Sequence, residues 1–182
     1  CGFFFVKKKI AHKFNVHKLN NAANLLSHRG PDNSKVFINN DVFVKFFRLS
    51  IQDLSLNGMQ PMFSQSKNIM IVFNGEIYNF KKLRKHLNVK LLKSNSDTEV
   101  LLNLYEEMGT KVFKLIKGMF SILIYDLKSK KILVARDQFG IKPLYVSETN
   151  ESIIFSSEIK PILYYSSKTN LNYNSMAEFL FL

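Results

Sequence analysis

The segment Asp41–Leu49 is predicted to form a strand that is apolar on both faces, and this pattern constrains the fold more than any other feature. Its apolar side chains alternate between the two faces, with Val42, Val44 and Phe46 on one and Phe43, Phe47 and Leu49 on the other. A strand of this kind is buried on both sides. The sheet that contains it therefore needs a layer of structure against each face.

The rest of the chain provides the elements for such layers. Further strands are predicted at 2–6, 36–38, 69–73, 119–125, 131–135, 143–146 and 152–155, the third of them ending at Asn74-Gly75. Helical spacing is predicted over 16–28, 79–87 and 158–164, and again from Met176. Because hairpins outnumber β-α-β units, we expect an α+β fold, a sandwich of two sheets flanked by helices.

The segment SDTE, Ser96–Glu99, is predicted to start another helix. Ser96 can accept a hydrogen bond at the helix N-terminus while Glu99 reaches back, which is the pattern of a capping box. Asp97 then lies in the first turn, where a carboxylate is favoured. The apolar pattern of this helix is interrupted near Gly109.

The composition excludes several classes of protein. A hydrophobic content of 46% is ample for a core and excludes wholesale disorder. No apolar run approaches the roughly 20 residues that a membrane-spanning helix needs. The single cysteine leaves no internal disulfide and too few thiols for a cysteine-ligated metal site, which fits a reducing compartment. We expect no metal site and no membrane partner.

The net charge of +12 suggests a nucleic-acid partner, but the kind of cation argues against one. Of the 26 cationic residues only four are arginine, the residue best suited to read phosphates and guanine edges. The lysines are largely scattered along the chain rather than arranged in a stripe. We therefore expect a solvated basic surface and no nucleic-acid partner.

The only cysteine is the first residue of the chain. An α-amine and a thiol have similar ordinary pKa values, so a proton can move between them near neutral pH. Such a residue can serve as a nucleophile activated by its own amine. Two alternatives are an accidental start left by processing and a lipid-bearing cysteine. The second is disfavoured because the apolar Phe3–Val6 follows instead of a polar tether.

Seven motifs then occur in a family-specific order: Cys1-Gly2, HRGPD at 28–32, RLSI at 48–51, NGEIYN at 74–79, SDTE at 96–99, ARDQFGIKPLY at 135–145 and FSSEIK at 155–160. In this order the chain resembles the class II glutamine amidotransferases, and among them most resembles the glutaminase domain of asparagine synthetases. The resemblance implies an Ntn-hydrolase-like four-layer sandwich of two antiparallel β-sheets flanked by α-helices. It also implies hydrolysis of L-glutamine to L-glutamate and ammonia.

The resemblance implies a role for each site residue. Cys1 is the implied nucleophile, with its α-amine as base, and Asn74 and Gly75 are the implied oxyanion hole. Arg48 is implied to bind the α-carboxylate of glutamine, and Asp97 with Glu76 its α-ammonium. Backbone groups of Leu49, Ser50, Ile51 and Gln52 are implied to line the same pocket. By contrast, Arg29, Asp32, Arg136, Asp137 and Lys142 are interpreted as structural, forming a buried turn and its ion pairs.

The resemblance covers residues 1–164, the expected glutaminase domain, and leaves 165–182 as a linker and the start of a C-terminal synthetase domain. That domain is the expected partner, with ATP and Mg²⁺ as its cofactors and asparagine formed from aspartate as its product. We expect no cofactor in the present chain, a cytoplasmic location, and leave a homodimer open. Two alternatives are an amidotransferase with a different acceptor and an inactive copy that binds glutamine. Departures from the family pattern at Phe3–Phe5 and Phe46 motivate the inactive copy.

Overall fold

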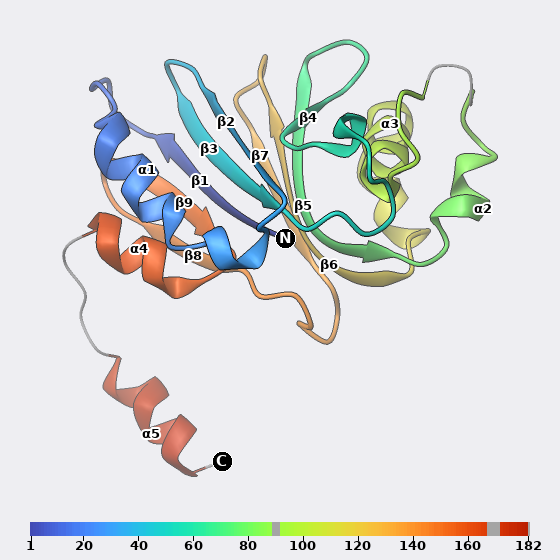
Figure 1. Ribbon diagram of the computed structural model, residues 1–182. Helices are drawn as coiled ribbons and strands as arrows, with labels where there is room; N and C mark the ends of the chain where they lie inside the picture. Colours follow the sequence, from blue (N-terminus) through green and yellow to red (C-terminus); the bar gives the residue numbers. More distant parts are fainter. Residues whose placement is uncertain (89–91, 167–171, 182) are drawn as a thin grey trace.

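In the computed structural model, which describes residues 1–88, 92–166 and 172–181, two antiparallel sheets pack face to face. Figure 1 shows the two sheets side by side, with helices outside each of them. The expected sandwich of two sheets flanked by helices is therefore confirmed.

The first sheet has five strands in the order β2 (Asn33–Ile38), β3 (Val42–Arg48), β1 (Gly2–Lys8), β9 (Ser152–Ser156) and β8 (Tyr145–Glu148). The second has four, in the order β4 (Met62–Phe63), β5 (Ile69–Ile77), β6 (Gly118–Asp126) and β7 (Ile132–Arg136). The first residue of the chain thus leads into the central strand of the five-stranded sheet. This arrangement places Cys1 at one end of the layer between the sheets.

Helices cover the outer face of each sheet. Helices α1 (Val16–Asn24) and α4 (Ile159–Ser166) cover the five-stranded sheet, and α2 (Phe80–Arg84) and α3 (Asp97–Met108) cover the four-stranded one. Short 3-10 helices lie at Ser27–Arg29, Leu56–Gly58 and Gly109–Lys114. None of the helices within the described ranges is both long and apolar enough to cross a membrane.

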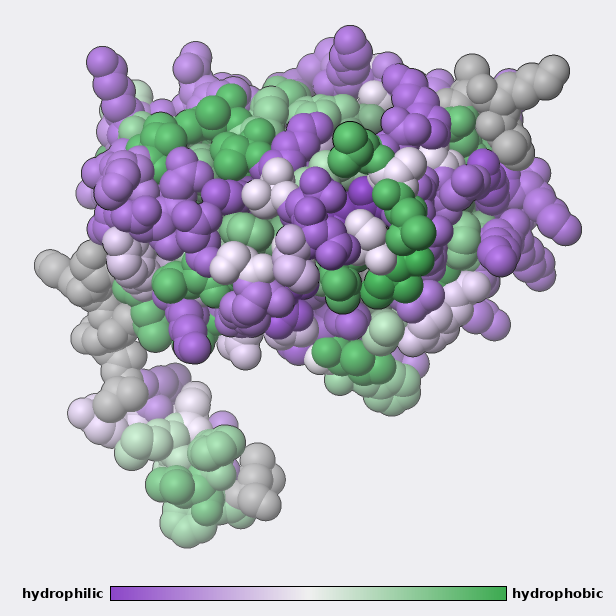
Figure 2. Space-filling model, viewed as in Figure 1, coloured by the Kyte–Doolittle hydropathy of each residue, from purple (hydrophilic) through white to green (hydrophobic). Residues whose placement is uncertain are grey.

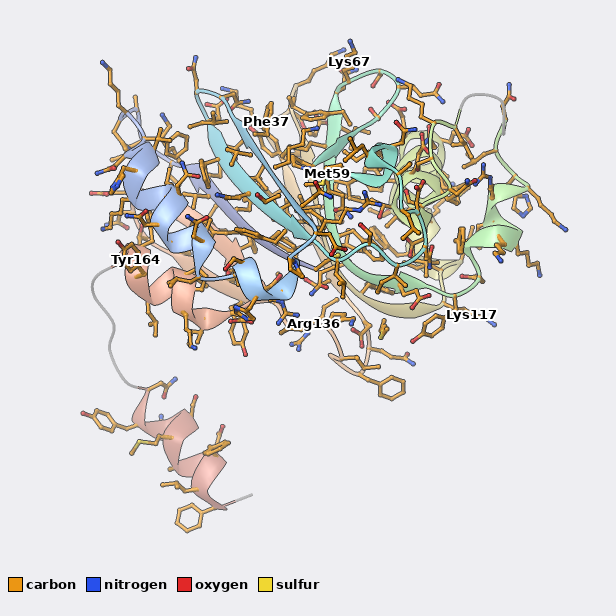
Figure 3. The ribbon with its side chains drawn as sticks, viewed as in Figure 1. Phe37, Met59, Lys67, Lys117, Arg136 and Tyr164 are labelled. Atoms are coloured by element: carbon orange, nitrogen blue, oxygen red, sulfur yellow. The ribbon has the colours of Figure 1, made fainter. Side chains whose placement is uncertain are left out.

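Three apolar cores lie in the molecule, one between the two sheets and one on the outer face of each sheet. Strand β1 contributes side chains to two of these cores. Phe3 and Phe5 point into the layer between the sheets, while Phe4 points toward α1 and α4. The same alternation holds in β3, so the expectation that this strand is covered on both faces is confirmed. Between the sheets, the ring of Phe37 in β2, labelled in Figure 3, lies 5.1 Å from that of Phe63 in β4, edge to face.

Several predicted strand ends differ from the structure, and two of these differences bear on the site. Strand β5 does not end at Asn74-Gly75 but pairs with β6 as far as Ile77. The asparagine–glycine pair favours a turn locally, but the facing residues of β6 continue the ladder, and Gly75 permits the close approach. Strand β3 ends at Arg48, so Leu49 lies beyond the strand and is 43% exposed.

Only one of the two hydrogen bonds of the predicted capping box forms. Ser96 accepts a hydrogen bond from the N–H of Glu99, as predicted. The carboxylate of Glu99 does not return to Ser96; it accepts from the N–H groups of Lys93 and Ser94 and from the Ser94 hydroxyl. These donors lie on the segment before the helix and satisfy the carboxylate more completely than a single N–H would.

The C-terminal segment stands apart from the sandwich. Helix α5 (Tyr173–Phe181) has no buried residue, and Figure 1 draws it away from the sheets. Met176, Phe179 and Leu180 expose apolar side chains there, and Figure 2 shows them as a green surface. The linker expected within 165–182 falls in part on residues 167–171, which lie outside the described residues.

Candidate active site

The thiol of Cys1 is held at the end of the layer between the sheets. Its Sγ atom accepts a hydrogen bond from the N–H of Leu49 at 3.3 Å and lies 3.4 Å from the carbonyl oxygen of the same residue. Leu49 directly follows β3, which pairs with β1 from Gly2 onward. The ladder between these strands therefore fixes where the sulfur lies.

The α-amine of Cys1 has an unusually low pKa. Burial, followed by the positive charges of Arg29 and Lys142, lowers this pKa from 8.0 to about 6, against the opposing charge of Asp32. An amine with this pKa is largely neutral at pH 7 and can accept a proton. The first residue thus carries both a nucleophile and a base.

A pocket opens beside this thiol. It is lined by most of the residues that the family resemblance singled out: Cys1, Arg48, Leu49, Ile51, Gln52, Gly75, Glu76 and Asp97. Two of the expected residues do not line it. Ser50 directs its N–H to a carboxylate oxygen of Asp32 at 2.7 Å, and Asn74 is buried behind the pocket surface.

Asn74 carries a buried amide nitrogen that lacks a hydrogen-bond partner among the described residues. Its side chain is 3% exposed, and its Nδ2 atom has no hydrogen-bond acceptor there. Because Met70 and Val72 of the same strand face the middle layer, the alternation places Asn74 on that side too, the side on which Cys1 packs. An unpaired buried donor is costly, which points to a ligand that accepts from it.

Gly75 follows Asn74 on β5, at a point where the backbones of β5 and β6 lie close together. A Cβ atom at this position would lie 2.1 Å from the carbonyl oxygen of Met119 and 2.7 Å from Cα of Phe120. No side chain fits in this space, so glycine is required for β5 to pair with β6 at this point.

The guanidinium of Arg48 is fixed by the loop that follows it. Its Nη1 atom donates to the carbonyl of Ser55 and its Nη2 to that of Asp53, and the side chain is 5% exposed. Asp53 in turn accepts from the N–H of Asn95 at 2.7 Å. Burial alone would raise the pKa of Asp53, but hydrogen bonds from Ser55 and from the Asn95 N–H, together with the charge of Arg48, hold it below its ordinary value. The loop and the arginine therefore stabilise each other.

Two carboxylates also line the pocket. Asp97 is 6% exposed and accepts a hydrogen bond from the N–H of Ile77 at 2.8 Å. Burial and the nearby negative charge of Glu76 raise its pKa to about 6, although backbone N–H groups oppose the rise. Glu76 accepts from the side-chain amide of Gln52 at 3.1 Å. A ligand cation between these carboxylates would favour their charged forms.

The charged residues that were interpreted as structural use backbone partners more than ion pairs. Arg136, labelled in Figure 3, donates to the carbonyls of Gly140 and Lys142. The Asp137 carboxylate accepts from the N–H of Phe120 on β6 and from those of Phe139, Ile141 and Lys142 in its own loop. Neither Arg136 nor Asp137 forms the expected ion pair among the described residues. Arg29 does form an ion pair, with Glu158 at 3.0 Å.

Several further pocket residues were not predicted as site residues, although Ser96 and Thr98 belong to the SDTE motif. Asp53, Gly58, Gln60, Phe73, Ser96 and Thr98 also line the pocket. Gly58 belongs there because a Cβ atom would lie 2.5 Å from Nη2 of Arg48. A glutamine in a loop, such as Gln60, is ordinarily exposed, so no pattern marks it as part of a site.

The arrangement suits attack on a neutral carbonyl that carries charged groups at its far end. A thiol and a base lie on one residue, an amide donor lies nearby, and an arginine and two carboxylates line the same pocket. Among the described residues, no three His, Cys, Asp or Glu side chains gather into a group that could hold a metal ion.

Curated relatives of the chain are asparagine synthetases. It is 44% identical over 146 residues to asparagine synthetase [glutamine-hydrolyzing] 2 of Bacillus subtilis, covering 80% of this chain and 19% of the relative. It is 35% identical over 185 residues to asparagine synthetase 1 of the same organism, covering 99% of this chain and 29% of the relative. The chain thus spans less than a third of the length of either relative.

Solved structures share the fold. Glutamine phosphoribosylpyrophosphate amidotransferase from B. subtilis, complexed with ADP and GMP, superposes with a TM-score of 0.73 at 18% identity, over 91% of this chain and 44% of that one. A structure of the allosteric regulatory enzyme of purine biosynthesis gives 0.74 over 91% and 43%. The glutamine amidotransferase domain family matches the chain over residues 1–182. With the same two-sheet fold and family match, this chain belongs to the class II glutamine amidotransferases.

Proposed function

We propose that this chain hydrolyses L-glutamine to L-glutamate and ammonia, with Cys1 as the nucleophile. The observation that carries the proposal is the convergence of three groups at one end of the middle layer. These are the Cys1 thiol, its α-amine with a pKa of about 6, and the unpaired buried amide of Asn74. Family membership supports the same reaction.

In the first half of the reaction, the sulfur of Cys1 attacks the side-chain amide carbon while the α-amine takes the thiol proton. The oxygen of the tetrahedral intermediate is negative and would accept from the Asn74 amide and the Gly75 N–H. The ammonium of Cys1 then gives its proton to the departing nitrogen, so that ammonia leaves and a γ-glutamyl thioester remains.

In the second half, water attacks the thioester carbon and gives a proton to the same amine. The intermediate collapses, the C–S bond breaks, and the sulfur recovers the proton as glutamate leaves. No group other than Cys1 has to move a proton. The low pKa of its amine suits this role because the amine must be neutral at the start of both halves.

The two ends of the glutamine backbone have matching partners in the pocket. The hydrogen bonds of Arg48 to Asp53 and Ser55 use two of the five guanidinium N–H groups, which leaves others for the α-carboxylate. Asp97 and Glu76 would hold the α-ammonium. We therefore propose that Arg48, Asp97 and Glu76 bind the ends of the substrate that do not react.

Glutamate release from glutamine by the wild type and by Cys1→Ala tests the proposal. We expect release by the wild type only, together with a covalent adduct of a glutamine-like electrophile at Cys1. Equal release by both proteins would contradict it. A matched preparation that retains a methionine before Cys1, verified by mass spectrometry, should fold but be inactive because the α-amine is then an amide.

The packing gives no support to an inactive copy. Phe3, Phe4, Phe5 and Phe46, whose departure from the family pattern suggested one, are 0% exposed and do not line the pocket. They fill the apolar cores instead. Calorimetric binding of glutamine without measurable turnover would nevertheless favour the binding-only alternative.

For the whole protein, we propose that the ammonia is used to form asparagine from aspartate, with ATP and Mg²⁺ bound by a C-terminal synthetase domain after residue 164. Named relatives of much greater length support this proposal. Asparagine formation from glutamine, aspartate and ATP by the full-length protein tests it, and another amide product would identify a different acceptor. Fractionation and size-exclusion chromatography test the cytoplasmic location and the homodimer.

A further inference from the structure

Gln60 is a buried glutamine whose side chain connects two sides of the pocket. It is 4% exposed and lies between the 3-10 helix at Leu56–Gly58 and β4. Its Oε1 accepts from the N–H of Phe73 at 2.6 Å, and its Nε2 donates to the carbonyl of Phe73 at 3.2 Å and to the hydroxyl of Thr98 at 3.2 Å. All its polar atoms are therefore used within the protein.

At one end, this amide extends the sheet. Strand β4 pairs with β5 only at Met70 and Ile71, so no backbone of β4 faces Phe73. A carboxamide carries one acceptor and a donor group, as a peptide unit does, and it takes the place of a strand at Phe73. Phe73 directly precedes Asn74 and Gly75, so these two bonds hold the segment that would meet the reacting oxygen.

At the other end, the amide holds the start of α3. Thr98 is 3% exposed and directly follows Asp97 in the first turn of the helix. Asp97 also accepts from the N–H of Ile77 on β5. Gln60 and Asp97 therefore join the same strand to the same helix at two points, one at each side of the Asn74–Glu76 segment.

Resting on the proposed function, we infer that Gln60 is a positioning residue that sets the spacing between the oxyanion donors and the carboxylates that hold the substrate ammonium. That spacing selects a side chain of the length of glutamine over one that is a methylene shorter, such as asparagine. Binding energy alone separates substrates that differ by one methylene by about 10- to 200-fold. The discrimination therefore depends on holding both ends of the pocket at fixed separation.

Gln60→Met removes all three hydrogen bonds at similar volume. We expect kcat for glutamine to fall about 10- to 100-fold, because misplacing reacting groups by about 1 Å can cost about 100-fold. The ratio of kcat/KM for glutamine to that for asparagine should fall several-fold as well. Gln65→Met, the same change on an exposed glutamine outside the pocket, should keep both values.

Thr98→Val tests the inference without disturbing Phe73. It removes only the link to α3, so the discrimination ratio should again fall, and Thr98→Ser should recover part of it. Gln60→Met and Thr98→Val should be less than additive because they break one connection. Circular dichroism and thermal unfolding identify variants that fail to fold.

The result that overturns the inference is a folded Gln60→Met or Thr98→Val protein with an unchanged discrimination ratio. Loss of activity on glutamine and asparagine by one common factor would also overturn it, because that pattern shows general damage. A wild type without glutaminase activity would instead contradict the proposed function. Calorimetric affinities for glutamine and asparagine then measure the discrimination between the two at the level of binding in the same variants.

Discussion

Arg29 donates a hydrogen bond from its Nε atom to the carbonyl oxygen of Cys1 at 3.0 Å. Its Nη1 atom is held by Glu158, whose carboxylate also accepts from His28 at 2.8 Å. The guanidinium is therefore fixed beside the chain terminus, where its positive charge disfavours protonation of the α-amine. After burial, it is the largest cause of the lowered pKa of that amine.

The first prediction concerns the acidic limb of the pH profile. With an amine pKa of about 6 in the free protein, kcat/KM for glutamine should fall as the pH drops through 6 and the base becomes protonated. Arg29→Gln removes a charge that lowers this pKa, so the limb should move to higher pH. Steady-state rates between pH 5 and about 9 measure both profiles. A limb that stays in place would mean that another group titrates.

The second prediction concerns Asp97, whose pKa is raised to about 6 in the free protein. The carboxylate is charged only above this pH, so binding of the substrate ammonium should strengthen as the pH rises through 6. Asp97→Asn should raise KM for glutamine and remove this ionisation from the profile of kcat/KM, while kcat keeps the limb of the amine. Glu107→Gln, an exposed change on the same helix, serves as the control. A profile of kcat/KM identical to that of the wild type would contradict the assignment.

The third prediction separates binding from transition-state stabilisation. Asn74→Ala should lower kcat about 10²–10³-fold with KM nearly unchanged, because the oxyanion exists only during the reaction. Arg48→Ala should mainly raise KM and cost about 2–4 kcal/mol in kcat/KM, with partial recovery in Arg48→Lys. Steady-state kinetics on glutamine measure both. The opposite pattern, with Asn74→Ala changing only KM and Arg48→Ala only kcat, would show both assignments to be wrong.

The fourth prediction concerns the close contact at Gly75. In Gly75→Ala the new methyl would overlap the Met119 carbonyl, so β5 and β6 must separate, at a cost of about 1–3 kcal/mol in unfolding free energy and a large loss of kcat. Gly109→Ala is the matched control. Its φ of 62° imposes strain of about 1–2 kcal/mol, but no atom lies within 4 Å of the added Cβ, so kcat should be kept. Chemical denaturation and kinetics distinguish the two. Equal effects on kcat would contradict a local role for Gly75.

The layers of this fold are predictable from the sequence because both faces of β3 carry apolar residues. The points at which the strands near the site end are harder to predict from the sequence. At Asn74-Gly75, local preference favours a turn, and only the partner strand β6 decides that β5 continues. Glu99 has the spacing of a capping box, but the residues before the helix supply better donors than Ser96 does.

Some site residues can likewise be predicted from the sequence, and others can be identified only in the structure. Cys1, Arg48 and Asp97 lie in motifs that can be read along the chain, and the fold brings them to one pocket. Gln60 lies in no such motif, because its role depends on the absence of a strand beside Phe73. Arg29 was interpreted as structural from its motif alone. Its contact with the Cys1 carbonyl spans 28 residues and is visible only in three dimensions.

The three consecutive phenylalanines of β1 have a consequence for folding. A slip of one residue moves each side chain to the opposite face, and hydrophobic alternation normally opposes such a slip. Here Phe3, Phe4 and Phe5 would supply a phenylalanine to either core after the slip, so the apolar pattern opposes it only weakly. Polar and steric contacts at the start of the strand must choose the correct pairing.

Two contacts can make that choice. Ser157 accepts from the N–H of Phe3 through its hydroxyl at 3.0 Å and donates its own N–H to the carbonyl of Phe3 at 3.0 Å. At Gly2 a Cβ atom would lie 2.8 Å from Cδ of Arg29, so a larger residue there would displace the Arg29 side chain. A slipped strand would carry the Cys1 sulfur about 3.3 Å along the sheet and away from Leu49. Ser157 and Gly2 thus favour the strand register that places the Cys1 thiol at the pocket over a slipped register that the apolar cores would also accept.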